Sequence, residues 1–261
     1  MNLIVCIKQV PSSNEVRMDP VTHTIVRDAK QSVINPFDLH ALEAAVALKE
    51  RFGGTVTVLS MGIPATRELL RDAVARGADR GLLLSDRAFA GADTLATSHA
   101  LAAGVRSLEE PFDLILCGKM ATDGDTAQIG PELAEQLGVP HVTDVTALLG
   151  AEEDSLTVRR ALAGGHEDLH VPLPALITVT REFNLPRLPS LAGVRRSLTA
   201  PCPVVGADAL GVDPARVGLN GSPTQVVRTF VPQRTRESVA LTGSAGEQAA
   251  AILELFKGVR A

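Results

Sequence analysis

The sequence predicts an α/β protein with a mainly parallel sheet and helices on both of its faces. Short apolar or β-branched runs alternate with helical patterns, and 45% of the residues are hydrophobic while 21% are charged. The runs are continuous rather than alternating, which is typical of parallel strands that are buried on both faces. They cover residues 3–7, 55–60, 81–84, 114–117 and 176–180. Sheets of this class bind ligands at the carboxyl ends of their strands.

Four helical patterns accompany these runs, and the residues at their ends support them. Asn35 precedes the first in the capping position, Pro36 occupies its first turn, and Gly53 stops it. Asp93 precedes the third pattern. The patterns cover residues 36–52, 66–76, 94–107 and a stretch that ends at Gly138.

Residues 156–173 differ from the rest, because two alternating segments flank Gly164 and Gly165 and predict an antiparallel hairpin appended to the sheet. His166 and His170 lie in this hairpin. Their spacing would suit a metal pair on a helix, but on a strand we expect no metal site.

The pattern changes again after residue 185, since seven of the 16 prolines fall between Pro186 and Pro232 and no helical or strand period is sustained there. We expect residues 1–185 to form a nucleotide- or flavin-binding domain. Residues 186–261 are expected to form an extended arm that needs a surface to lie on, its own domain or a partner subunit, and to end in a helix at about residues 246–257.

Composition excludes several classes of function. The net charge of -5 argues against nucleic-acid binding. No apolar stretch approaches the roughly 20 residues that span a bilayer, so no membrane insertion is expected. The start of the chain lacks the features of a signal peptide, and three distant cysteines favour neither disulfides nor zinc. We therefore expect a reducing compartment and a cytoplasmic protein.

The strongest chemical signal is the strand-to-helix junction at residues 114–138. Gly118, Gly124 and Gly130 permit close approach to the backbone, Thr126 and Gln128 offer donors, and a helix N-terminus follows. This combination predicts a cradle for the phosphates of an adenine-containing cofactor. The alternative is a capped loop with nothing bound, and the acidic side chains there count against simple phosphate attraction.

Local structure within this junction has two interpretations. Asp125 with Gln128 resembles a capping box, while Pro131 suits a first helical position. The sequence therefore leaves two possible starts for this helix, or a kink within it. Neither a P-loop nor a G-x-G-x-x-G fingerprint occurs.

Two further clusters accompany the cradle. Thr94, Thr97 and Ser98 fall on one face at the start of a helix, where they either cap it or bind a phosphate or ribityl chain. The turn from Asn35 to Asp38 either begins a helix or places backbone groups against an adenine. Because no nucleophilic or metal-hydrolase motif occurs, binding without bond-making chemistry is favoured.

Four segments in this order resemble the β subunits of electron-transfer flavoproteins, over nearly the whole chain. The segments are Val-Cys-Ile-Lys-Gln-Val-Pro at 5–11, Asn-Pro-Phe-Asp at 35–38, Asp-Gly-Asp-Thr-Ala-Gln-Ile-Gly-Pro at 123–131 and Thr-Arg-Glu-Phe-Asn-Leu-Pro-Arg-Leu-Pro-Ser-Leu at 180–191. The resemblance implies a fold related to the adenine-nucleotide α-hydrolase group and an α subunit that carries the electron-transferring FAD. It implies a cofactor site that includes Cys6, Lys8, Val10, Asn35, Phe37, Asp38, Met61, Asp123, Gly124, Asp125, Thr126, Ala127, Gln128 and Gly130.

Members of this family hold either AMP or a second FAD in the β subunit. The loop at 123–128 resembles the FAD-holding, electron-bifurcating type, and so do the residues that would hold a ribityl chain and a diphosphate. FAD is therefore the expected cofactor, with AMP as the alternative. The residues that would hold the ribityl chain and the diphosphate are Asp93, Thr94, Thr97, Ser98 and Thr224.

The resemblance also implies a recognition loop for an acyl-CoA dehydrogenase-like or quinone-reducing flavoprotein, which would use Phe183, Asn184, Pro186 and Arg187. Phe183 stands near the position where mitochondrial-type members carry a leucine. The alternative interpretation of the arginines in this region is that they are ordinary solvated surface charges. The expected function is an electron-transfer subunit rather than an enzyme, with bifurcation a narrower possibility. A nucleotide-sensing stress-type module is the alternative class, against which the long arm argues.

Overall fold

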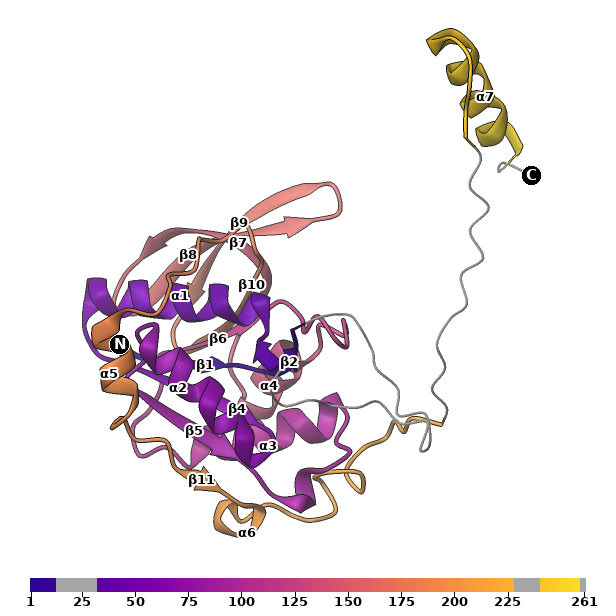
Figure 1. Cartoon of the computed structure of the whole chain (residues 1–261). Coiled ribbons are helices and arrows are strands. Elements are labelled where there is room, and N and C mark those ends of the chain that lie inside the picture. Colours follow the sequence, from indigo (N-terminus) through magenta and orange to yellow (C-terminus); the bar gives the residue numbers. More distant parts are fainter. Residues whose placement is uncertain (13–31, 228–239, 259–261) are drawn as a thin grey trace. The chain divides into compact units, whose positions relative to one another are not determined.

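The structure is a computed structural model that describes residues 1–12, 32–227 and 240–258 (Figure 1). The chain forms two compact units, residues 1–225 and 226–261. Within the described residues, the first unit contains a nine-stranded sheet in the order β11-β5-β4-β1-β6-β10-β7-β8-β9. The first six strands of this order are all parallel: β11 (Val204–Val205), β5 (Arg80–Leu84), β4 (Thr55–Met61), β1 (Asn2–Cys6), β6 (Leu114–Gly118) and β10 (Ala175–Val179).

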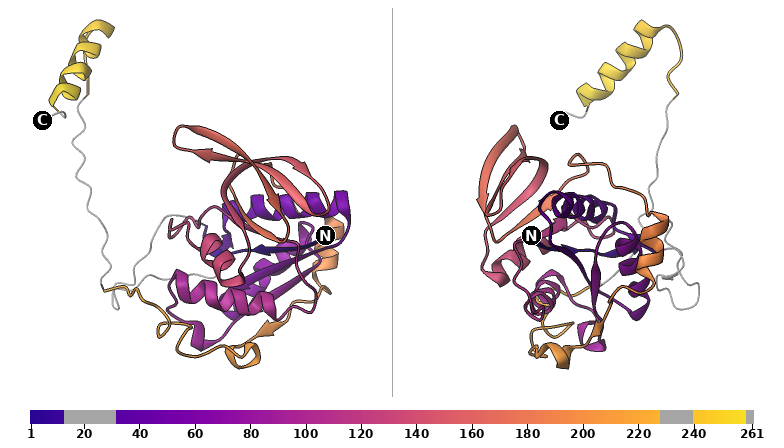
Figure 2. Two further views of the ribbon diagram at one scale, coloured as in Figure 1. Left: turned by 180° about the vertical axis from the view of Figure 1, so that it is seen from behind. Right: turned by 90° about the vertical axis from the view of Figure 1, so that its left-hand side faces the viewer.

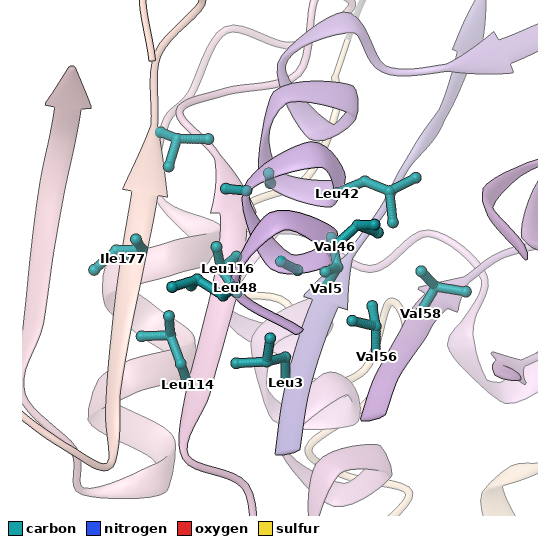
Figure 3. Close-up of a cluster of buried hydrophobic side chains, with 14 of the residues drawn as sticks. Leu3, Val5, Leu42, Val46, Leu48, Val56, Val58, Leu114, Leu116 and Ile177 are labelled. Atoms are coloured by element: carbon teal, nitrogen blue, oxygen red, sulfur yellow. The ribbon is translucent and has the colours of Figure 1, made fainter. Parts of the chain in front are cut away.

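Helices cover both faces of this sheet, so the predicted α/β class is confirmed (Figure 2). In β1, Leu3 and Val5 pack toward α1 and α2, while Ile4 and Cys6 pack toward α3 and α4. Figure 3 shows the first of these clusters, where Leu42 and Val46 of α1 lie over the strands. The helices are α1 (Pro36–Phe52), α2 (Arg67–Ala75), α3 (Thr94–Arg106) and α4 (Ile129–Leu137), with short 3-10 turns η2 (Pro64–Thr66) and η3 (Arg87–Phe89).

The predicted hairpin is confirmed as β8 (Ser155–Leu162) and β9 (Gly165–Pro172), which pair antiparallel. Strand β7 (His141–Ala151) was not predicted. It runs parallel to β10 and antiparallel to β8, and thus joins the hairpin to the sheet. Only three of its 11 residues are buried, so the strand contains no continuous apolar run of the kind that marks the other parallel strands. A small ribbon, β2 (Gln9–Pro11) with β3 (Ser32–Ile34), follows β1.

The regular alternation of strands and helices ends near the boundary expected after residue 185. The first compact unit nevertheless continues to Gln225. The residues expected to form an extended arm contain three short elements, α5 (Leu191–Ser197), β11 and α6 (Ala207–Leu210). Gly193 allows α5 to lie directly on the end of α2, where a Cβ would come within 2.0 Å of the Ala75 carbonyl oxygen. The Gly81 N–H donates to the Pro201 carbonyl at 2.9 Å, which adds this segment to the sheet edge.

The second unit contains α7 (Ala245–Gly258), which confirms the predicted final helix. Ser244 and Glu247 form a capping box at its start, because the Glu247 Oε2 accepts from the Ser244 N–H at 2.8 Å. No helix in the described part of the chain is both long and apolar enough to cross a membrane.

Candidate nucleotide-binding site

The carboxyl ends of the parallel strands lie along one edge of the sheet. Cys6 at the end of β1 is in register with Leu59 of β4 and with Cys117 of β6. Gly118, which ends β6, directly follows Cys117, and Met61, which ends β4, lies two residues beyond Leu59. The topology brings together residues that lie far apart in the sequence, as expected for a ligand site of this class.

Asn35 and Asp38 connect three segments at this edge. The Asp38 carboxylate accepts from the backbone N–H of Lys8 at 2.7 Å and of Gly118 at 3.2 Å. The Asn35 side chain donates to Asp38 at 2.9 Å and to the Met120 carbonyl at 2.9 Å. Asn35 occupies the capping position of α1, as predicted, but its side chain makes no capping hydrogen bond to the helix. These side chains hold the loop after β6 in place, with their polar atoms already engaged.

Asp38 is buried, and burial raises its pKa to about 7, against the hydrogen bonds from Asn35, Lys8 and Gly118, which lower it. The result is a carboxyl that changes charge near neutral pH at the base of the loop. Lys8 itself is exposed and pairs through Nζ with Asp123 Oδ1 at 2.7 Å. Val10, in β2, is buried and contributes packing.

The loop from Asp123 to Gln128 presents six consecutive exposed residues. Asp125 and Ala127 have left-handed backbones, with φ of 51° and 55°. The N–H groups of Gly124 and Asp125 donate to the Ala121 carbonyl at 3.3 and 2.9 Å, so these two are engaged within the loop. The expected capping box of Asp125 with Gln128 was wrong, because Gln128 is the capping residue of α4 and makes no side-chain cap. The helix begins at Ile129, which places Pro131 third.

The three glycines of the junction have different roles. A Cβ at Gly118 would lie 2.4 Å from Asp38 Oδ1, and a Cβ at Gly130 would lie 2.3 Å from Thr178 Cγ2. Both glycines therefore permit close packing within the protein. A Cβ at Gly124 meets nothing within 4 Å, so this glycine alone of the three has open space beside it.

The helix start predicted as a second cluster lies against the loop. The Thr94 hydroxyl is 3.0 Å from Glu132 Oε1 and 3.4 Å from Gln128 Oε1. Thr97 is half-buried. The buried Ser98 hydroxyl donates to the Leu95 carbonyl at 2.8 Å, so it is engaged within its own helix.

Asp93 ties this helix to the chain beyond α6. Its carboxylate caps α3 through the Ala96 N–H at 3.1 Å and accepts from the Thr224 N–H at 3.0 Å and hydroxyl at 2.9 Å. Burial raises the pKa of Asp93, but the hydrogen bonds from Ala96, Thr224 and Ser222 outweigh it, and the net shift is downward. Two residues that lie far apart in sequence and were both predicted for the cofactor site are thus in contact.

Glu132 is a site residue that sequence reasoning missed. Its Oε2 is buried without a hydrogen-bond partner, and burial raises its pKa, with Asp93 adding to the rise and the Thr94 hydrogen bond opposing it. A glutamate in a first helical turn ordinarily indicates only a favourable dipole interaction. Its orphaned oxygen can accept a hydrogen bond from a hydroxyl group of a ligand.

A cavity of about 390 Å³ opens beside the loop. The guanidinium of Arg181 lies 4.6 Å from the centroid of the Phe37 ring, which is favourable cation–π geometry. Lys119, which was likewise not predicted, pairs with Asp144. Its position immediately after Gly118 was the available signal. The cavity is lined by Phe37, Lys119, Met120, Thr122, Asp125, Thr180, Arg181 and Glu182.

The residues expected to recognise a partner pack against α1. Asn184 donates through Nδ2 to the His40 carbonyl at 2.9 Å. Arg187 forms a bidentate pair with Glu43, at 2.9 and 3.0 Å, and also binds Glu50. Phe183 packs on the core and Pro186 is half-buried. The Arg187 guanidinium is therefore ion-paired with α1, although its side chain is still 35% exposed.

The fold and this edge site define an α/β protein of the ligand-binding, parallel-sheet class. The sequence matches the electron transfer flavoprotein domain family over residues 22–210. Similar proteins include an electron transfer flavoprotein subunit beta of Thermoanaerobacterium thermosaccharolyticum, 46% identical over 97% of both chains. FixA of Bradyrhizobium diazoefficiens is 45% identical over 97% of this chain and 90% of its own. The CarD subunit of the caffeyl-CoA reductase-Etf complex of Acetobacterium woodii is 43% identical over 97% and 96%.

The chain therefore belongs to the electron transfer flavoprotein family, as a β subunit. It is an electron carrier rather than an enzyme. The resemblance that the ordered segments implied is confirmed.

Proposed function

We propose that the chain is the β subunit of a cytoplasmic, heterodimeric electron-transfer flavoprotein and holds FAD at the carboxyl edge of its sheet. The observation that carries the choice of FAD is the contact of Thr94 with Glu132 at 3.0 Å, which joins a second polar cluster to the first turn of α4, directly after the loop. A single phosphate, as in AMP, needs only the loop. A diphosphate with a ribityl chain needs a longer row of polar groups, and the start of α3 supplies it.

The residues suit the parts of such a ligand. The N–H groups of Thr126, Ala127 and Gln128 and of the first turn of α4 would donate to phosphate oxygens, helped by the helix dipole. The carboxylates of Asp93 and Glu132 would repel phosphate but accept hydrogen bonds from sugar or ribityl hydroxyls. Apolar Cys6 and Met61 lie where an adenine would find a dry surface. When bound, FAD supplies reversible uptake of one or two electrons.

In this proposal, an α subunit completes the carrier, and the arm beyond residue 185 contributes to holding it. The segment of Phe183, Asn184, Pro186 and Arg187 belongs to the surface that meets an acyl-CoA dehydrogenase-like or quinone-reducing flavoprotein. The name of CarD, a subunit of a complex with a reductase, supports such an association.

The test is to purify the chain with its α partner, denature the complex and quantify flavin and AMP per heterodimer. Two FAD per heterodimer are expected and would fit a bifurcating carrier. One FAD with one AMP would exclude FAD from this site while retaining the family function. The chain contains no Trp and no Tyr, so a near-ultraviolet band from the isolated subunit reports its ligand directly.

A further inference from the structure

A second cavity, here called the distal cavity, lies at the C-terminal end of α1. Its volume is about 340 Å³, and its lining comes from the last turn of α1, from β7, β8 and β9, and from the turn between β7 and β8. A helix rises about 1.5 Å per residue, so Arg51 in this lining is about 24 Å along the helix axis from Asn35, which holds the loop after β6. The two cavities share no lining residue. The distal cavity is therefore separate from the candidate nucleotide-binding site.

Three residues in register across the antiparallel strands contribute to the lining. Thr157 of β8 lies opposite Gly150 of β7 on one side and opposite His170 of β9 on the other. Gly150 follows an irregularity in the pairing of β7 with β8 and leaves this row without a side chain at one position. A Cβ at Gly150 would have Thr157 as its nearest contact, at an ordinary 3.7 Å, so packing within the protein does not require the glycine. Glycines and bulges inside strands often mark places where a ligand approaches the sheet.

The charged and polar groups around this row are available to a ligand. In the described part of the chain, the one hydrogen bond of the Arg51 guanidinium is a long one, from Nη2 to the Ala151 carbonyl at 3.4 Å. The guanidinium also lies 4.8 Å from the centroid of the Phe52 ring, which favours its orientation. Glu152 and His170 are exposed, and neither side chain has a hydrogen-bond or ion-pair partner among the residues that the structure describes.

These groups favour one chemical class of ligand. A guanidinium is planar and matches a carboxylate through two parallel hydrogen bonds. The Glu152 carboxylate accepts hydrogen bonds from an ammonium or hydroxyl group and repels a doubly charged phosphate. Thr157 and His170 can each donate or accept. The volume lies at the lower end of the range for ligand pockets, so the ligand is small.

We propose that the distal cavity binds a small amino or hydroxy carboxylic acid, with Arg51 holding the carboxylate and Glu152 holding the ammonium or hydroxyl group. Gly150 leaves the space for the ligand, and Thr157 and His170 supply further hydrogen bonds. The ligand joins the end of α1 to the antiparallel strands. This inference uses neither the cofactor nor the partner of the proposed function, so it stands or fails separately.

The experiment is a calorimetric titration of the complex with its α subunit. The probes are L-serine, L-glutamate and L-lactate, which carry a carboxylate with an ammonium or hydroxyl group, and acetate and inorganic phosphate, which lack this combination. At least one of the first three should bind once per heterodimer, with a dissociation constant at least about tenfold below those of acetate and phosphate. The same ligand should raise the melting temperature of the complex.

Two variants locate the site. Arg51→Gln should weaken binding by about tenfold or more, because it removes a charge-assisted pair of hydrogen bonds. Gly150→Val should abolish binding, because its side chain would fill the open position of the row, and the φ of Gly150 lies outside the left-handed range that a valine would resist. Arg106→Gln is the matched control, since Arg106 lies in the last turn of α3 and likewise donates to a backbone carbonyl, that of Gln136. Its affinity should equal that of wild type.

Each other outcome overturns the inference. If none of the five probes binds the wild-type complex, the distal cavity is not a site for such acids. If acetate or phosphate binds as tightly as the amino and hydroxy acids, the site is one for simple anions and the proposed class is wrong. Unchanged affinity in Arg51→Gln, or an equal loss in Arg106→Gln, would place the ligand elsewhere. Melting temperatures of the variants verify folding, and Arg51→Gln decides alone if Gly150→Val does not fold.

Discussion

The Asp93 carboxylate accepts two hydrogen bonds from Thr224, from its backbone N–H at 3.0 Å and from its hydroxyl at 2.9 Å. It also caps α3, so one side chain joins the segment beyond α6 to the proposed cofactor site. This dual role makes Asp93 a sensitive point at which to test the site.

Asp93→Ala should lower the free energy of unfolding by about 1 kcal/mol, the usual cost of a lost helix cap, and should also reduce the cofactor retained per heterodimer. Asp86→Ala is the matched control, because Asp86 caps η3 through Ala88 at 3.0 Å and holds the Ala207 N–H at 2.9 Å. Asp86→Ala should lower the free energy of unfolding without reducing the cofactor retained per heterodimer. Chemical denaturation and flavin quantification measure the two effects, and equal retention in both variants would remove Asp93 from the site.

Asp38 should make stability depend on pH between about 4 and 7. Burial raises its folded-state pKa from 3.8 to about 7, so the native state binds the proton more tightly than the unfolded chain does. The free energy of unfolding should therefore decrease as pH rises through this window and level off above it. Asp38→Asn should be less stable at low pH, because an amide cannot accept from all three donors, but it should lack this contribution to the slope. Parallel pH dependences for both proteins would contradict the assignment.

Gly118→Ala should lower the free energy of unfolding by about 1–3 kcal/mol, because its Cβ would overlap Asp38 and lie 2.6 Å from Phe37 Cβ. Gly124→Ala is the contrasting variant. Because the space around Gly124 is open, the free energy of unfolding should change by less than about 1 kcal/mol. If the proposed cofactor binds at this loop, the added methyl group should weaken its retention. Thermal unfolding and cofactor content distinguish the two, and a stable Gly118→Ala protein would contradict the close approach.

The three cysteines should be unreactive in the native protein. All are buried, and the pKa of Cys117 is raised by a hydrogen bond with Cys6 and by burial, while burial raises the pKa of Cys202. Because the thiolate is the reacting form, a disulfide reagent at pH 8 should modify no thiol rapidly before unfolding and three afterwards. Rapid modification of the native protein would show that the edge of the sheet opens.

Local features of the sequence were sufficient for most of the architecture. The buried strands, the ends of α1 at Pro36 and Gly53, the hairpin and α7 follow from apolar runs, turn residues and periodicity, which are properties of neighbouring residues. The ordered segments were likewise sufficient for the family. Strand β7 and helix α5 escaped prediction because their stability comes from the neighbours on which they lie, β8 and β10 for one and α2 for the other.

By itself, the sequence determined the α/β class and the family, and it predicted the junction at 118–131 as the place where a cofactor would bind. Only the tertiary structure decided what each side chain there does. It engaged Asn35 and Asp38 in holding the loop, left one oxygen of Glu132 without a partner while the other accepts from Thr94, and exposed Leu185 while pairing Arg187 with Glu43. The reason is physical. Hydrogen bonding and burial depend on partners that the crossover connections of the sheet bring together, and those partners cannot be identified from the residues that neighbour a position in the sequence.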